Sequence, residues 1–327
     1  QRWVRDVAYS PDGQWIATAG GDATARIWRA EDGRQQSVMA GHTGAVNGVD
    51  WSADGTRLAT VSDDGTARVA DIADGAGRER LALSAQDTGN GLYSVAFSPD
   101  GARMMTGDFG LVALKFWDVS RTGGAEWGSV EGLEIVPGGR GSLAFTEDGD
   151  GISVATGGGE VTTFDVVTGA PLRSVGPSGG PDLERFDVSP DGAILATSAD
   201  EVPVDLWDAR TGEHLAALRP ETGGYVTDLD WSADGELLAI AMAGEQAGSV
   251  VVVDRSGQEQ AVLWEEEDVY IQTVSFNPAG DRLATTRDPY RDDPSLRGVR
   301  IWDWAQGEVV RTLDAVSVDA VFDDSSE

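Results

Sequence analysis

The sequence of 327 residues contains no cysteine and only two histidines, His42 and His214. Without cysteine, the chain can form no disulfide, hold no metal through thiolates and use no cysteine nucleophile. Two histidines leave little material for imidazole catalysis or for a histidine-rich metal site. We therefore predict no catalytic residues, no metal site and no cofactor.

Positive charge is also scarce. The chain carries 56 acidic and 24 basic residues, a formal net charge of −32, and Lys115 is its only lysine. Phosphate backbones and anionic lipid surfaces are bound by cationic surfaces. The charge balance therefore predicts that neither a nucleic acid nor a membrane is a partner.

Long apolar runs are absent as well. The most apolar stretch, Val250 to Val253, has the length of a strand and is far shorter than the roughly 20 residues that span a bilayer. The first six residues contain no apolar core of a secretion signal. We therefore expect a cytoplasmic location. Because the chain starts without Met and directly in a strand-like pattern, we also expect it to be a piece of a longer protein.

What the sequence does contain is a repeat. An alternating apolar stretch is followed by Ser-Pro-Asp-Gly or a near copy, and this phrase occurs seven times. Its closing glycines are 42, 46, 46, 43, 43 and 45 residues apart. They are Gly13, Gly55, Gly101, Gly149, Gly192, Gly235 and Gly280.

Each unit has the pattern of four short strands. In the second unit, strands are predicted over 46–51, 57–61, 66–71 and 80–83, separated by turns rich in Asp and Gly. A single four-stranded sheet leaves both faces uncovered, whereas radial stacking of seven such sheets covers them. The prediction is an all-β, seven-bladed β-propeller of four-stranded antiparallel blades, forming one domain. Its approximate units are 1–45, 46–91, 92–141, 142–182, 183–225, 226–270 and 271–315, with a tail at 316–327.

The third strand of each unit carries a resemblance to a known family. It ends in a Trp or Trp-Asp pair in four units, at Trp28, Trp117-Asp118, Trp207-Asp208 and Trp302-Asp303, and Gly41-His42 precedes the second unit. These residues resemble the WD40-repeat family, and the chain is similar to propeller modules of large bacterial signalling proteins. The family's buried network of His, Ser or Thr, Asp and Trp is eroded here. The second unit offers His42, Thr60 or Ser62, and Asp64, but Ala70 replaces its Trp. We therefore expect apolar packing to hold most blades together.

The resemblance also implies a binding face. In this family, the residues at the head of each first strand, together with the loops beside them, commonly contact partners. Two expanded loops, 109–113 and 287–298, are expected on the same face. Aromatic residues and Arg are enriched at interface hot spots. The candidate partner-binding residues are Trp3, Arg5, Tyr93, Tyr225, Tyr270 and Tyr290, with ordinary packing of these rings as the alternative.

Together these features predict a function without catalysis. The chain is expected to be a protein-interaction scaffold or sensing module of a longer regulatory or signalling protein. Its partners would be other proteins or other domains of its parent chain. Two alternatives remain: a propeller enzyme with an acidic central channel, and a structural or autoinhibitory lid on the parent protein.

Overall fold

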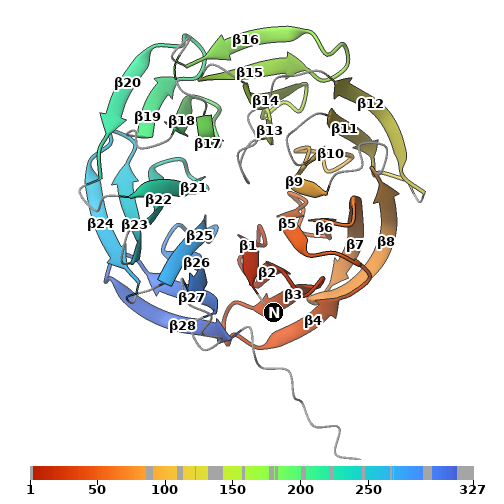
Figure 1. Cartoon of the computed structure of the whole chain (residues 1–327), viewed down its shortest axis with the longest axis horizontal. Helices are drawn as coiled ribbons and strands as arrows, with labels where there is room; N and C mark the ends of the chain where they lie inside the picture. The colour runs from red at the N-terminus through yellow and green to blue at the C-terminus, as the bar shows by residue number, and fades with distance from the viewer. Residues whose placement is uncertain are drawn as a thin grey trace, which may run out of the picture.

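A computed structural model describes most of the chain as a ring of seven sheets. It describes residues 3–85, 91–108, 113–121, 123–131, 143–156, 159–176, 180, 183–199, 204–220, 224–244, 247–265, 267, 269–289 and 297–314. These residues contain no helix and form seven four-stranded antiparallel sheets around a central axis (Figure 1). The predicted seven-bladed propeller is confirmed.

In every blade the strands follow one another in chain order, from the axis to the rim (Figure 1). We call these four positions a, b, c and d. Blade 1 holds β1 (Val4–Tyr9), β2 (Trp15–Gly20), β3 (Ala25–Arg29) and β4 (Gln35–Met39). Blade 2 holds β5 (Val46–Trp51), β6 (Arg57–Ser62), β7 (Thr66–Ala73) and β8 (Ala76–Ser84). Blade 3 holds β9 (Leu92–Phe97), β10 (Arg103–Asp108), β11 (Ala113–Asp118) and β12 (Ala125–Glu131). Blade 4 holds β13 (Leu143–Phe145), β14 (Gly151–Thr156), β15 (Glu160–Asp165) and β16 (Pro171–Val175).

The remaining three blades follow the same order. Blade 5 holds β17 (Leu183–Val188), β18 (Ile194–Ala199), β19 (Val204–Asp208) and β20 (His214–Leu218). Blade 6 holds β21 (Tyr225–Trp231), β22 (Leu237–Ala243), β23 (Gly248–Asp254) and β24 (Glu259–Trp264). Blade 7 holds β25 (Val269–Phe276), β26 (Arg282–Pro289), β27 (Gly298–Asp303) and β28 (Glu308–Asp314).

The seven repeated glycines all lie in the turn between strands a and b. In each turn the glycine N–H donates to the carbonyl three residues earlier, at 2.7–2.9 Å, and the glycine φ lies between 64° and 72°. Such a φ favours glycine because it has no Cβ. A methyl group on Gly13, Gly55, Gly149 or Gly235 would lie 3.4–3.7 Å from the proline Cδ in the corresponding turn of the preceding blade. The a–b turns therefore form one circle on one face, as the spacing predicted.

The ring closes without exchange of strands between the two ends of the chain. Blade 1 is built from the first four strands and blade 7 from the last four. An apolar cluster joins them, with Val299 and Ile301 packed against residues of blade 1. The Arg311 guanidinium of β28 also donates to the carbonyls of Glu31 and Asp32, at 2.8 and 2.7 Å. Blades 7 and 1 thus meet through apolar side-chain packing and through hydrogen bonds from a side chain to the backbone.

Buried apolar clusters fill every interface between neighbouring blades. Part of the family's polar network persists inside four blades, where the indole of the strand c Trp donates to a strand b Thr. The pairs are Trp28 with Thr18, Trp117 with Thr106, Trp207 with Thr197 and Trp302 with Thr285, at 2.9–3.0 Å.

Blade 2 keeps the other part of this network. The His42 ring contacts Asp64 through Nδ1 at 3.1 Å and Thr60 through Nε2 at 2.9 Å. Ser62 instead donates to the Gly44 carbonyl. Burial lowers the pKa of His42, although the Asp64 carboxylate acts in the opposite direction. The neutral imidazole is therefore a structural bridge between the turn Asp and strand b.

Candidate partner-binding face

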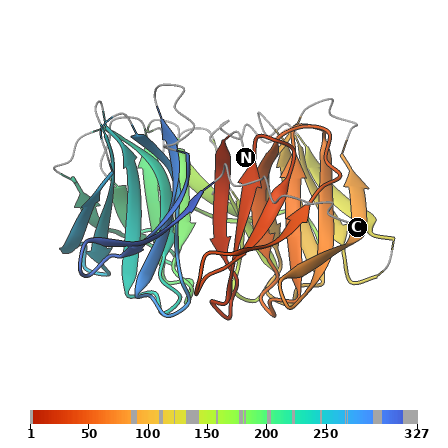
Figure 2. The same cartoon turned by 90° about the horizontal axis from the view of Figure 1, so that it is seen from below.

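The propeller has two faces of different construction. The a–b and c–d turns lie on one face, and the b–c and d–a connections lie on the other, which we call the loop face (Figure 2). Each strand a begins at the loop face, because its far end enters the a–b turn. Trp3 precedes β1, Tyr225 begins β21, and Tyr270 is the second residue of β25. Three predicted residues therefore lie on the loop face over blades 1, 6 and 7.

Within this group the rings form two contacts between blades. The rings of Tyr225 and Tyr270 lie 6.3 Å apart between centroids and are tilted by 50°. On the other side of blade 7, the Arg297 guanidinium lies 5.8 Å from the centre of the Trp3 ring. Trp3 is fixed by its carbonyl, which accepts the Gly21 N–H at 2.8 Å. A side chain at Gly21 would crowd the Trp3 ring.

A further aromatic residue, Trp264, belongs to the same face. Trp264 is the last residue of β24 and pairs with Ser249 near the start of β23, so it lies at the loop-face end of blade 6. Its exposed fraction is 53%, against 41% for Trp3 and 45% for Tyr225. Sequence analysis did not single it out, although an aromatic residue at the end of strand d, beside a d–a loop, was a usable signal.

These residues define what we call the aromatic patch: Trp3, Tyr225, Trp264, Tyr270 and Arg297. Trp3, Tyr225 and Trp264 are the three exposed aromatic residues among those whose side-chain exposure the structure describes. All three lie at the loop-face ends of blades 6 and 1, on either side of blade 7. Such clustering on one sector is unlike the scattered single exposures that are normal for a protein surface.

The structure places Arg5 and Tyr93 in a second group, over blades 1 to 3. The Arg5 guanidinium contacts the Asn47 amide oxygen and lies 3.2 Å from the Asp63 carboxylate. The buried Asn47 amide donates to Asp63 at 2.7 Å and to the Leu92 carbonyl at 2.8 Å. Burial and the charge of Asp63 raise the pKa of Tyr93, against the effect of Arg5. Arg5 therefore joins three blades and is turned away from the aromatic patch.

Part of the predicted site cannot be placed. Tyr290 lies outside the described residues, as do 109–112 of the first expanded loop and 290–296 of the second. The described end of the second loop is Arg297, which contacts Trp3.

A second candidate site is the central cavity, which measures about 260 Å³ and is lined by strands a. Five aspartates face it, and each accepts a backbone N–H from strand a of the next blade at 2.6–3.0 Å. The pairs are Asp6 with Val49, Asp50 with Phe97, Asp187 with Trp231, Asp228 with Val274 and Asp230 with Phe276. Strand a is the innermost edge strand of its sheet. Its N–H groups on the side of the central axis therefore have no partner strand. These carboxylates therefore link the innermost strands of neighbouring blades.

Burial is the main cause of the raised pKa values in this cavity, and nearby like charges add to it. Burial raises the pKa of Asp50 to about 7, against the Phe97 N–H, and the charge of Asp6 adds to the rise. Burial also raises the pKa of Asp187 to about 7, and the pKa of Asp230 well above its ordinary value. Among the described residues, no three His, Asp or Glu side chains are placed to hold a metal ion.

No helix within the described residues is long and apolar enough to cross a membrane.

The blades, their a–b turns and the Trp–Thr pairs define a seven-bladed propeller of repeated four-stranded units. The family profile described as "WD domain, G-beta repeat" matches residues 1–29 and 33–71, which cover blade 1 and most of blade 2. With the same architecture repeated in all seven blades, the chain is a WD40-repeat β-propeller. A comparison with curated protein sequences found no match. WD40 propellers are generally non-catalytic scaffolds for protein interaction.

Proposed function

We propose that this propeller is a non-enzymatic module that binds a protein partner through the aromatic patch on the loop face. The observation that carries this proposal is the gathering of Trp3, Tyr225 and Trp264 on one sector. Aromatic rings that are held by packing contribute binding energy with little loss of conformational freedom. The partner is a separate protein or another domain of the parent chain, in a regulatory or signalling role.

The charge of the molecule indicates the character of that partner. With a net charge of −32, the propeller attracts basic surfaces and repels acidic ones at long range. We therefore expect a partner surface with an apolar centre for the aromatic patch and basic residues around it.

The structure favours this function over an enzyme with an acidic channel. The central aspartates accept backbone N–H groups at four interfaces between blades. A carboxylate that is occupied in this way is poorly placed to act as a base or to bind substrate.

The test is a binding experiment with matched variants. The immobilised chain would capture partners from a lysate of its source cells, and one identified partner would then be titrated against purified variants. Tyr225→Ala and Trp264→Ala should each weaken binding by about 2 kcal/mol, or roughly thirtyfold, if they are hot spots. Thermal melting of every variant would show that the fold is intact.

The control variant is Leu215→Ala, which removes an exposed apolar side chain from β20 on the rim of blade 5. It should leave affinity unchanged. If Leu215→Ala weakens binding while both aromatic variants bind like the parent, the partner uses the rim, and the proposal is wrong.

A further inference from the structure

One position of the repeat, the last residue of strand a, holds a different type of residue in a single blade. The last residue of strand a points toward the preceding blade and is aromatic in six blades: Tyr9, Trp51, Phe97, Phe145, Trp231 and Phe276. In blade 5 this residue is Val188. Blade 5 carries its ring two residues earlier, as Phe186, at a position where the other blades have Val or Leu. The interface between blades 4 and 5 therefore lacks a ring only at the level of the a–b turns.

The strand c residue that blade 4 contributes to this interface also differs in kind from its counterparts in the other blades. On strand c of the preceding blade, the other interfaces present an apolar residue: Ile27, Val69, Phe116, Leu206, Val252 or Ile301. Blade 4 presents Thr163, whose hydroxyl lies 3.0 Å from that of Ser153. Both hydroxyls are buried. Around Val188 and Thr163 the interface is thus smaller in side-chain volume and more polar than its equivalents.

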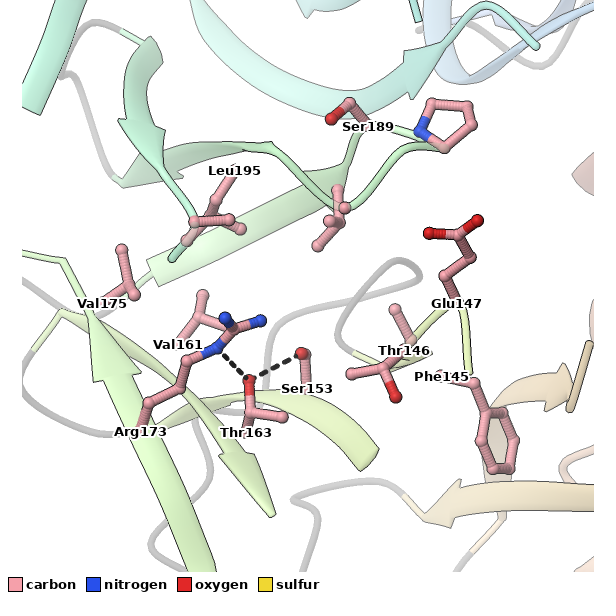
Figure 3. A pocket seen from close by; sticks show the side chains of 15 residues that line it. Phe145, Thr146, Glu147, Ser153, Val161, Thr163, Arg173, Val175, Ser189 and Leu195 are labelled. Carbon is pink, nitrogen blue, oxygen red and sulfur yellow. Dashed lines mark hydrogen bonds between the residues drawn. The ribbon is translucent and has the colours of Figure 1, made fainter. Parts of the chain in front are cut away.

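The result is a pocket of about 170 Å³ (Figure 3). Val161, Val175 and Leu195 form an apolar wall. Arg173, on the outer strand β16, extends its guanidinium over the two hydroxyls, and its Nε donates to the Thr163 Oγ1 at 3.5 Å (Figure 3). A cavity of about 150 Å³ with apolar walls is known to hold one benzene ring. The space therefore suits a single ring.

The charged side chains that line the pocket determine which substituents a bound ring can carry. Arg173 offers charge-assisted hydrogen bonds at one end, and the hydroxyls of Ser153 and Thr163 add neutral donors. Glu147 lies on the opposite side of the pocket, with Asp148 next to it in the chain (Figure 3). An anionic group is favoured only at the Arg173 end, and a second anionic group would meet Glu147.

From these observations we propose that the pocket between blades 4 and 5 binds a small aromatic monocarboxylate. The ring of the ligand takes the place of the ring that Val188 lacks, and its carboxylate pairs with Arg173. This site is separate from the aromatic patch, because it is formed by different blades.

The test uses phenylacetate as the probe, titrated into the intact chain and followed by calorimetry or ligand-observed NMR. A ligand of this size should bind with a dissociation constant of about 1 mM or below. Benzyl alcohol, which keeps the ring without the charge, should bind at least about tenfold more weakly. Arg173→Ala should weaken phenylacetate by a similar factor. Arg78→Ala removes an exposed arginine from the outer strand of blade 2 and should have no effect.

A second pair of variants fills the pocket. Val188→Phe restores the aromatic residue of the other blades and should abolish binding while leaving the melting temperature equal or higher. Thr163→Leu offers the same test if Val188→Phe fails to fold. The proposal is overturned if phenylacetate does not saturate the chain by about 20 mM. It is overturned equally if benzyl alcohol binds as tightly, or if binding survives in the filled variants.

Discussion

At the scale of single residues, the central aspartates are the most unusual groups of this protein. Acidic side chains of neighbouring blades face one small cavity, and each accepts an N–H from the next inner strand. The hydrogen bonds stabilise the ring, whereas burial and mutual repulsion oppose ionisation. The raised pKa values of Asp50 and Asp187, both about 7, are the balance of these effects.

A pH dependence of stability follows for Asp50. Its pKa is raised in the folded state, so its contribution to stability is fully present below the unfolded pKa, near 3.8, and is lost as pH rises through about 7. Asp50→Asn keeps an oxygen acceptor for the Phe97 N–H and removes the charge. The variant should be more stable than the parent at about pH 8, and this advantage should fall by about 1–2 kcal/mol by about pH 5.5.

Urea unfolding at a series of pH values measures this difference directly. Glu213→Gln removes an exposed carboxylate and should follow the parent curve. If the unfolding free energies of the parent and Asp50→Asn change with pH in parallel, burial does not raise the pKa of Asp50.

At the scale of strands and turns, glycines set how closely the blades approach one another. Gly75 and Gly212 both lie in c–d turns and have nearly the same φ, 74° and 73°. A Cβ on Gly212 would meet nothing within 4 Å, whereas one on Gly75 would lie 2.5 Å from the Trp15 ring of blade 1. The same backbone conformation therefore occurs with and without a neighbour.

This pair separates backbone strain from packing. Gly212→Ala should cost about 1 kcal/mol, because only the positive φ opposes a side chain. Gly75→Ala should cost about 1–3 kcal/mol more, because the indole of Trp15 must also move. The free energies of unfolding in urea provide the measurement. Equal costs for the two substitutions would show that the contact between blades 1 and 2 yields freely.

At the scale of the whole molecule, the net charge is the dominant electrostatic feature. A charge of −32 on one ring implies strong self-repulsion, which salt screens as the Debye length falls from about 10 Å at 0.1 M to about 3 Å at 1 M. We expect the melting temperature to rise as sodium chloride is added over this range. A constant or falling melting temperature would contradict this expectation.

The same net charge predicts that the chain does not bind duplex DNA. A DNA gel shift at physiological salt would contradict this prediction.

Much of the fold could be predicted because its signals are local. The a–b turns follow from Ser-Pro-Asp-Gly, in which the Ser hydroxyl contacts the Asp carboxylate and the Gly takes a positive φ. Where the bounds of a strand differ from the predicted ones, the reason is also local. Strand d of blade 2, expected over 80–83, begins at Ala76. Asp74 and Gly75 both have positive φ, which matches a two-residue hairpin turn that extends both strands.

The sequence by itself determined the number of blades, their order and the chemistry of their turns, because each depends on residues close together in the chain. Only the tertiary structure decided which side chains meet across neighbouring blades. It turned Arg5 toward Asp63, brought Trp264 to the face of Trp3 and Tyr225, and placed Arg173 beside the space left by Val188. These relations depend on how neighbouring sheets are rotated and stacked, and no spacing along the chain records that geometry.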